Sequence, residues 1–268
     1  GSLMNVFMYE LKAHRKALII WSVSVVIFMA MSMAKFGTLS ADAEGMRQIM
    51  SQFPPTMQAV FGMSGLDITT LGGYFGICFL YIELLLAIHG GLLGVSVLAE
   101  EEQDKTTEFL YVKPVGRAKI ITQKLMAGLL NIFVLWGVTA ASAWVSIEAA
   151  ASMKGFEKEF MLFMGAALLI QLVFFFVGSL AAGVVKNSRS PGRYLAIAVF
   201  VSYLLFVFSK LSDSFDWLKY VSVFRFFDAA ELLANKSLNT VYVAICAGII
   251  VVCAVLTYVF YIRRDLEV

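Results

Sequence analysis

Charged residues are scarce in this chain of 268 residues: Asp, Glu, Lys and Arg make up only 15% of it, while 60% is hydrophobic. Soluble domains are nearer to one half apolar and one quarter charged. The surplus of apolar residues is gathered into long runs, which indicates several membrane-spanning helices. The formal net charge of +2 gives no support to a nucleic-acid partner, so none is expected.

Cysteine and histidine are also rare, with three and two residues respectively. An odd number of thiols inside apolar runs does not build a disulfide framework, so we expect the cysteines to be small apolar fillers. No spacing of Cys and His is typical of a metal site, and no metal is predicted. The cysteines are Cys78, Cys246 and Cys253.

Motifs for enzyme chemistry are missing as well. No G-x-x-x-x-G-K-[ST] sequence is present, so the chain does not bind ATP through a P-loop of its own. An intramembrane metalloprotease would need several His and acidic ligands at membrane depth. His89 stands alone there, and Glu100 and Glu101 lie at a helix end. We therefore expect that this chain is not itself an enzyme.

The apolar runs predict an all-α polytopic membrane protein with six transmembrane helices. A spanning helix needs about 20 mostly apolar residues to cross about 30 Å of hydrocarbon. Gly1 to Leu3 are interpreted as a cloning scar before Met4, which leaves residues 4–268 as one transmembrane domain. The predicted spans are residues 17–36, 74–98, 120–147, 160–185, 194–211 and 240–262.

The distribution of Lys and Arg predicts the orientation, because these residues are enriched in cytoplasmic segments. With both termini placed inside, 13 of the 21 Lys and Arg residues are cytoplasmic and eight are external, although the external segments are longer. Both termini are therefore expected in the cytoplasm. A separate expectation is that the chain lies in the cell membrane of a bacterium. The stretch "MNVFMYELKAHRK" before the first span suits an N-terminal helix in the cytoplasmic interface.

Two external segments are more than plain loops. Within residues 37–73, Pro55 is suited to the first turn of a helix that Gly62 would end. Residues 212–239 mix six Phe, Trp and Tyr residues with charged ones, which is too polar to span and too aromatic for a free loop. This composition predicts amphipathic helices at the outer interface or a re-entrant segment shielded by protein.

Four polar residues within the predicted spans are candidates for a substrate path: Glu83, His89, Asn131 and Gln171. A charged residue facing lipid at the bilayer centre costs about 2.5–3.5 kcal/mol, so Glu83 and His89 are expected to face protein or water. Glu83 is interpreted either as a cavity residue or as an interhelical hydrogen-bonding group. For Asn131 and Gln171, hydrogen bonds between packed helices are the alternative. A separate group of small residues is interpreted as allowing helices to pack closely: Gly90, Gly91 and Gly94.

A dense charged segment, "AEEEQDKTTEFLYVKPVGRAK", interrupts the apolar sequence after the second span. Residues 100–112 are good helix formers, and Pro114 would end that helix. Phe109 and Leu110 would form an apolar knob on one of its faces. The segment is interpreted either as a docking helix for a cytosolic partner or as an ordinary solvated elbow between two spans.

The longer stretch "EEEQDKTTEFLYVKPVGRAKIITQKL" resembles the cytoplasmic loop that follows the second span of type-2 ABC transporter permeases. Further likenesses are "QFPPTMQAVFGM", "VFRFFDAAELL" and "YIRRDLEV", so the resemblance covers essentially the whole chain, with six spans in matching order. The residues that match in the loop are Glu102, Thr107, Phe109, Leu110, Pro114, Val115 and Arg117.

The resemblance implies the membrane subunit of an ABC exporter. In that family two permease chains, identical or paralogous, pair within membrane lipid and dock two copies of a cytoplasmic ATPase. The ATPase copies bind ATP and Mg²⁺, so no cofactor is expected in this chain. The implied coupling helix holds the docking residues Glu101, Glu102, Lys105, Thr106, Thr107, Glu108, Phe109 and Leu110. A second cytoplasmic contact is implied at Lys186, Asn187, Ser188 and Arg189, and an outer gate at Trp217, Tyr220, Phe224 and Phe227.

Two other classes of function remain as alternatives. A secondary transporter or channel working alone would not retain a soluble P-loop protein, whereas an exporter permease should hold one stably. The two halves of the chain do not visibly repeat each other, so an inverted-repeat transporter gains no support. An intramembrane enzyme would need a metal ligand set that the sequence lacks.

Overall fold

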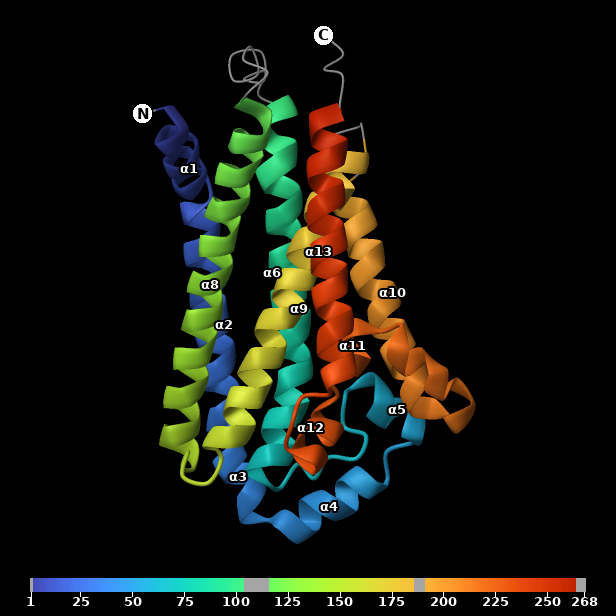
Figure 1. The fold of residues 1–268 in the computed structure, drawn as a ribbon. Helices are drawn as coiled ribbons and strands as arrows, with labels where there is room; N and C mark the ends of the chain where they lie inside the picture. Colours follow the sequence, from blue (N-terminus) through green and yellow to red (C-terminus); the bar gives the residue numbers. More distant parts are fainter. Residues whose placement is uncertain (1, 104–115, 186–190, 264–268) are drawn as a thin grey trace.

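The chain folds into a bundle of long helices, described by a computed structural model over residues 2–103, 116–185 and 191–263 (Figure 1). The described residues contain helices and no β-strand. Six helices are long and apolar enough to cross a membrane, which confirms the predicted all-α architecture. They are α2 (Arg15–Ala34), α6 (Leu71–Gln103), α8 (Arg117–Ala150), α9 (Glu157–Val184), α10 (Pro191–Leu211) and α13 (Thr240–Arg263).

The helix ends that flank residues 104–115 lie at one end of the bundle, the upper end in Figure 1. The beginning of α1 (Ser2–Ala13) and the end of α13 lie at the same end. A single non-helical residue, His14, separates α1 from α2, and its N–H still donates to the carbonyl of Glu10 at 3.1 Å. The predicted N-terminal helix is therefore present, and it adjoins α8.

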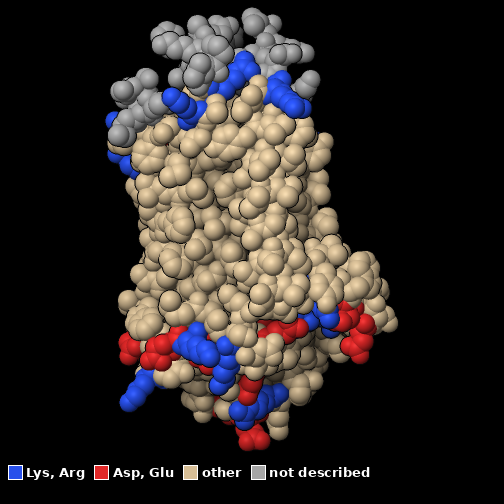
Figure 2. Space-filling model, viewed as in Figure 1, with Lys and Arg blue, Asp and Glu red and all other residues tan. Residues whose placement is uncertain are grey.

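Charged residues gather at the two ends of the bundle. Figure 2 shows a wide band without charge between an upper end with Lys and Arg and a lower end with both signs. Charge-free surface of this kind suits a hydrocarbon environment, because charged side chains are expensive there. The band therefore marks the part of the bundle that lies in the membrane.

Helices α6 and α9 form the centre of the bundle. Buried residues make up 67% of the most apolar window of α6 and 61% of that of α9, compared with 17% for both α2 and α13. Glycine allows the close contact: a Cβ added at Gly94 would lie 2.1 Å from the carbonyl oxygen of Phe175. A Cβ at Gly178 would lie 2.3 Å from the carbonyl oxygen of Gly91. The predicted role of Gly91 and Gly94 in close packing is confirmed, and Gly178 joins them.

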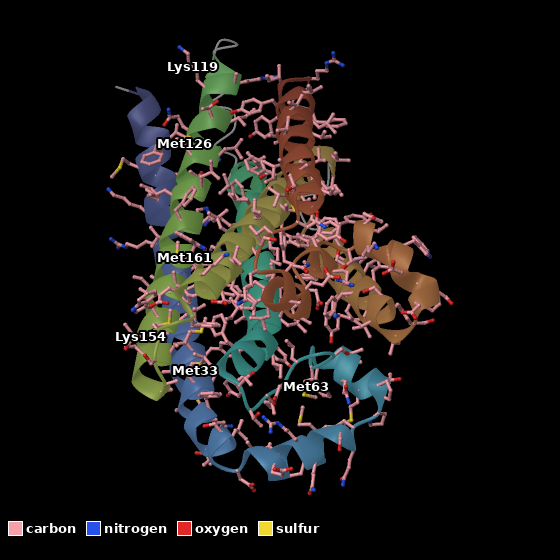
Figure 3. All side chains as sticks on the ribbon, turned by 60° about the horizontal axis from the view of Figure 1, so that its bottom comes forward. Met33, Met63, Lys119, Met126, Lys154 and Met161 are labelled. Carbon is pink, nitrogen blue, oxygen red and sulfur yellow. The ribbon has the colours of Figure 1, made fainter. Side chains whose placement is uncertain are left out.

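Three short helices, α3 (Phe36–Ala41), α4 (Ala43–Ser51) and α5 (Pro55–Val60), form an arc at the lower end (Figure 3). The helix predicted at Pro55 is confirmed, with proline in its first turn. Helices α3 and α4 were not predicted. The Asp42 side chain caps α4 by accepting the N–H of Gly45 at 3.2 Å.

The segment between α10 and α13 is also structured. It contains the 3₁₀-helix η2 (Asp213–Tyr220) and the short helices α11 (Val223–Phe226) and α12 (Ala229–Asn235). All four residues of α11 are buried, so this part is shielded by protein. Helix α12 packs on the lower turns of α6, where a Cβ at Gly76 would lie 3.0 Å from that of Ala229.

The three cysteines are buried free thiols, as the sequence predicts.

Two apolar clusters fill the interior. The larger one joins α2, α6, α8, α9, α10 and α13 with the lower elements, and the smaller one joins α1, α6, α8, α9 and α13. The upper part of the bundle thus has a core of its own.

Candidate functional site

The segment with the implied coupling helix lies between α6 and α8. Helix α6 continues through Gln103, so the backbone of Glu101 and Glu102 belongs to its last turn. The other implied docking residues, Lys105, Thr106, Thr107, Glu108, Phe109 and Leu110, lie outside the described residues. So do Lys186, Asn187, Ser188 and Arg189 of the implied second contact. The helices that flank these segments are α6 and α8 on either side of the first, and α9 and α10 on either side of the second.

The first turns of α8 are anchored to the end of α13. The guanidinium of Arg117 donates to the carbonyl oxygen of Ile262 at 3.1 Å. One turn further on, the hydroxyls of Thr122 and Tyr258 are hydrogen-bonded at 2.7 Å. These contacts hold the helix that leaves the charged segment against the last helix of the chain.

Helix α8 also carries a buried ion pair. The Lys124 ammonium is fully buried and donates to Glu10 Oε1 at 2.9 Å and to the Val97 carbonyl oxygen at 3.0 Å. Glu10 Oε2 lies 3.1 Å from His14 Nε2. Burial alone would raise the pKa of the Glu10 carboxyl, but the hydrogen bond from His14 and the Lys124 ammonium outweigh it and hold that pKa below its usual value.

Two of the substrate-path candidates meet at the contact between α6 and α9. His89 Nδ1 and Gln171 Nε2 lie 3.0 Å apart, and both residues are buried. The ring of Trp21 packs edge-on against the His89 ring at 5.3 Å. His89 therefore faces protein, as the insertion cost predicts. Its role in a substrate path stays a prediction.

The other two candidates have different surroundings. Asn131 is buried and donates to the carbonyl of Ala127 in its own helix at 2.9 Å. Glu83 is 2% exposed, and its Oε1 has no hydrogen-bond partner among the residues that the structure describes. It shares a face of α6 with Gly76, seven residues earlier, where α12 packs.

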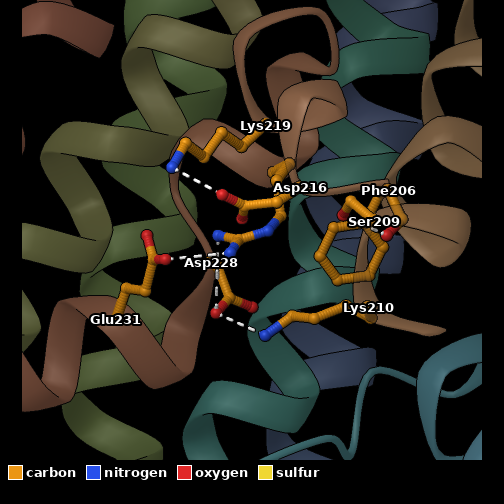
Figure 4. A network of polar contacts seen from close by, with 8 residues as sticks. Phe206, Ser209, Lys210, Asp216, Lys219, Asp228 and Glu231 are labelled. Atoms are coloured by element: carbon orange, nitrogen blue, oxygen red, sulfur yellow. Dashed lines mark hydrogen bonds and ion pairs between the residues drawn. The ribbon is translucent and has the colours of Figure 1, made fainter. Parts of the chain in front are cut away.

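A network of buried ion pairs ties α10 to α11 and α12 (Figure 4). Lys210 Nζ donates to Asp228 Oδ2 at 2.6 Å. Arg225 Nη2 donates to Glu231 Oε1 at 2.9 Å, and its Nη1 lies 3.9 Å from Asp228 Oδ2. Lys210, Arg225 and Asp228 are largely buried, so their contacts with one another are poorly screened by solvent, whereas the Glu231 side chain is 41% exposed.

The four outer-gate candidates divide into two pairs. Phe224 and Phe227 are 0% and 1% exposed, and Phe224 stacks on Phe174 of α9 at 5.7 Å. Trp217 and Tyr220 in η2 are 62% and 53% exposed. One part of the segment is thus built into the bundle, and the other presents aromatic rings at its surface.

Two hollows lie near these elements. A groove of about 420 Å³ between α6 and α10 is almost wholly apolar, with Leu84, Leu195 and Tyr203 in its lining. A hollow of about 410 Å³ at the lower end has the Arg47–Asp67 ion pair in its wall. Hydrogen bonds from Thr69, at 2.6 Å and 3.0 Å, hold the pKa of Asp67 below its usual value.

Within the described ranges no group of three or more His, Cys, Asp and Glu residues is placed to hold a metal ion.

Sequence reasoning missed both buried ion-pair networks. From the sequence, Lys124 is only one of the 13 Lys and Arg residues expected in the cytoplasm, and Lys210 only one of the eight expected outside. Their signal was their place inside or at the edge of an apolar run, where a charge usually has a partner.

Six apolar helices, a charge-free surface band between two charged ends on the face shown in Figure 2, and buried polar contacts between the spans define a multi-pass α-helical membrane protein. The family model of ABC-2 family transporter proteins matches residues 4–266, so the chain belongs to this family. It is a membrane permease subunit of an ABC transporter, and membership implies an ABC ATPase as partner. No curated protein matches the chain.

Proposed function

We propose that this permease is the membrane subunit of an exporter whose ATPase docks at the upper end of the bundle, on the cytoplasmic side. The observation that carries the proposal is the family match over residues 4–266, taken with the position of the α6 and α8 ends. These ends flank the charged segment that resembles the coupling helix. Hydrolysis of ATP, with Mg²⁺, belongs to the ATPase, because this sequence has no P-loop.

The docking surface is the charged segment at residues 101–110, with residues 186–189 as a second contact. Phe109 and Leu110 fill an apolar groove of the ATPase, while the surrounding charges set orientation and association rate. The charged character of the upper end supports this assignment (Figure 2). A pair of permease chains, identical or paralogous, binds two copies of the ATPase.

The exit gate is the segment from Trp217 to Leu233. Its support comes from the contrast within the segment, since Phe224 is buried against α9 while Trp217 is exposed. The Lys210–Asp228 ion pair holds the segment to α10 and is a contact that opening would have to break. Cargo reaches the gate past Glu83, His89, Asn131 and Gln171, which supply polar atoms inside an apolar bundle.

Replacing Phe109 with Ala tests the docking assignment. Apolar anchors carry most of the energy of an interface, so the variant should lose at least about 2 kcal/mol of ATPase affinity, roughly thirtyfold. Co-purification of the ATPase and its hydrolysis of ATP would be measured together. The spans should insert normally, because the change lies outside them.

Glu101→Gln is the matched control. It changes a charge at the rim of the same surface and should weaken retention of the ATPase much less than Phe109→Ala. If Phe109→Ala keeps full ATPase retention and full export, the segment is only an elbow and the ATPase docks elsewhere.

A further inference from the structure

The buried ammonium of Lys124 joins three helices at the upper end. It lies on α8, its carboxylate partner Glu10 lies on α1, and its carbonyl partner Val97 lies on α6. Lys124 is 0% exposed and Glu10 is 2% exposed. Charges inside a spanning region normally pair with one another or with backbone carbonyls, and Lys124 does both.

The position of this contact relates it to the docking segment. Val97 lies six residues before the end of α6 at Gln103, and Lys124 lies seven residues after the start of α8 at Arg117. At 1.5 Å per residue, the ammonium sits about 10 Å below both helix ends. It therefore cross-links the two helices that carry residues 104–115, close to the place where they leave the bundle.

Stability alone gives a weak reason for an ion pair at this place. Replacing a buried ion pair by packed apolar side chains is often neutral or stabilising, so such pairs are poor evidence for stability. The neighbouring residues Leu98, Ile121 and Leu125 show that apolar packing is available here. What a directional contact adds is register, because an ammonium with fixed acceptors resists sliding of one helix along another.

We propose that Lys124 is a positioning residue for the ATPase-docking segment. It fixes the spacing and register of α6 and α8 below the segment and fastens α1 to them through Glu10. A push by the ATPase on the segment then moves α1, α6 and α8 as one unit. The inference rests on the proposed function, because it takes residues 101–110 as the docking surface.

The test uses the full permease in complex with its ATPase and ATP–Mg²⁺ as the probe. Three variants are compared with the parent: Lys124→Met, the double variant Glu10→Gln with Lys124→Met, and Lys124→Arg. For each, the kcat and KM of ATP hydrolysis per bound ATPase, the amount of ATPase retained, and the thermal unfolding temperature are measured. No knowledge of the cargo is needed.

We expect Lys124→Met to lower kcat by about tenfold, within the usual range of coupling between sites, while KM and ATPase retention stay within about twofold. The double variant should lose no more than the single one, because both residues act as one unit. It also leaves no unpaired carboxylate in the interior, which protects its folding. Lys124→Arg keeps the charge and the donors and should recover most of the lost rate.

Lys119→Met is the matched control. Lys119 is an exposed lysine at the upper end of the same helix, and its side chain points away from the bundle (Figure 3). Its removal should leave kcat unchanged.

Two results would overturn the proposal. One is an unchanged kcat in a double variant that folds and retains the ATPase. The other is a parallel fall of kcat, retention and unfolding temperature in the Met, Arg and double variants, or a failure of all three to fold, since either means that the pair is only structural. Failure of the docking assignment gives a different result: Phe109→Ala would retain the ATPase.

Discussion

At the scale of single residues, the carboxylates of Glu83 and Asp228 are both buried but are held in different ways. Asp228 accepts a hydrogen bond from Lys210 at 2.6 Å, whereas Glu83 Oε1 has no partner among the described residues. Removing one member of a buried ion pair is strongly destabilising, because the other charge is left unpaired. We expect Asp228→Ala to lower the free energy of unfolding by about 3 kcal/mol. Glu83→Leu should leave that free energy unchanged or raise it.

Thermal unfolding of the purified variants in one detergent measures this difference. Asp216→Ala serves as the control, because Asp216 forms an exposed pair with Lys219 that should contribute little. A loss in Glu83→Leu as large as that in Asp228→Ala would show that Glu83 makes a stabilising contact. If Glu83→Leu leaves stability and export unchanged, Glu83 has no part in the substrate path.

The cost of placing charge in hydrocarbon is enough to predict from the sequence that Glu83 and His89 face protein. It does not reveal their partners, because pairing depends on which helices adjoin. The hydrogen bond between His89 and Gln171, 82 residues apart, needs the contact of α6 with α9. Lys124 escaped prediction for another reason: a lysine this close to the start of a span is equally typical of a side chain that reaches out to the interface.

At the scale of elements, the segment of η2, α11 and α12 combines exposed and buried aromatic residues. Single cysteines placed at Trp217 and Tyr220 should react rapidly with a reagent added from outside, since these positions are more than half exposed. Cysteines at Phe224 and Phe227 should react at least about tenfold more slowly, because their reaction needs local opening of packed structure. The three natural cysteines are buried and should contribute little background.

Equal, rapid labelling of all four positions would contradict this element structure and show a free loop. A variant such as Lys236→Cys, beyond α12 and exposed, provides the upper limit of the labelling rate. Similarly slow labelling at Phe224 and Phe227 would support a gate that is packed into the bundle in its resting state.

Long elements could be predicted from the sequence better than short ones. Six apolar runs of span length identify six helices, because a helix of about 20 residues crosses the hydrocarbon with all its backbone hydrogen bonds made inside its own segment. Helices α3 and α4 are too short and too polar for such a run. The cap residue Asp42 was the available signal for α4, but a single cap without an apolar stripe does not distinguish a helix from a turn.

At the scale of the whole molecule, the described charged residues gather at both ends of the bundle. On the face shown in Figure 2, Lys and Arg lie at the upper end, while acidic and basic residues mix at the lower end. The orientation rule counts Lys and Arg alone and predicts that the upper end faces the cytoplasm. Docking of a cytosolic ATPase between α6 and α8 requires the same orientation. A test of the orientation is therefore also a test of the docking assignment.

Two lysines at opposite ends of the bundle test that orientation. Lys119, in the first turns of α8, and Lys154, in the turn between α8 and α9, are both exposed (Figure 3). In intact cells a membrane-impermeant thiol reagent should label Lys154→Cys and spare Lys119→Cys, because the 34 residues of α8 separate the two across the bilayer. Both variants should label once the cells are opened, which controls for expression and reactivity. Labelling of Lys119→Cys alone in intact cells would place the upper end outside, and a cytosolic ATPase could then not reach the charged segment.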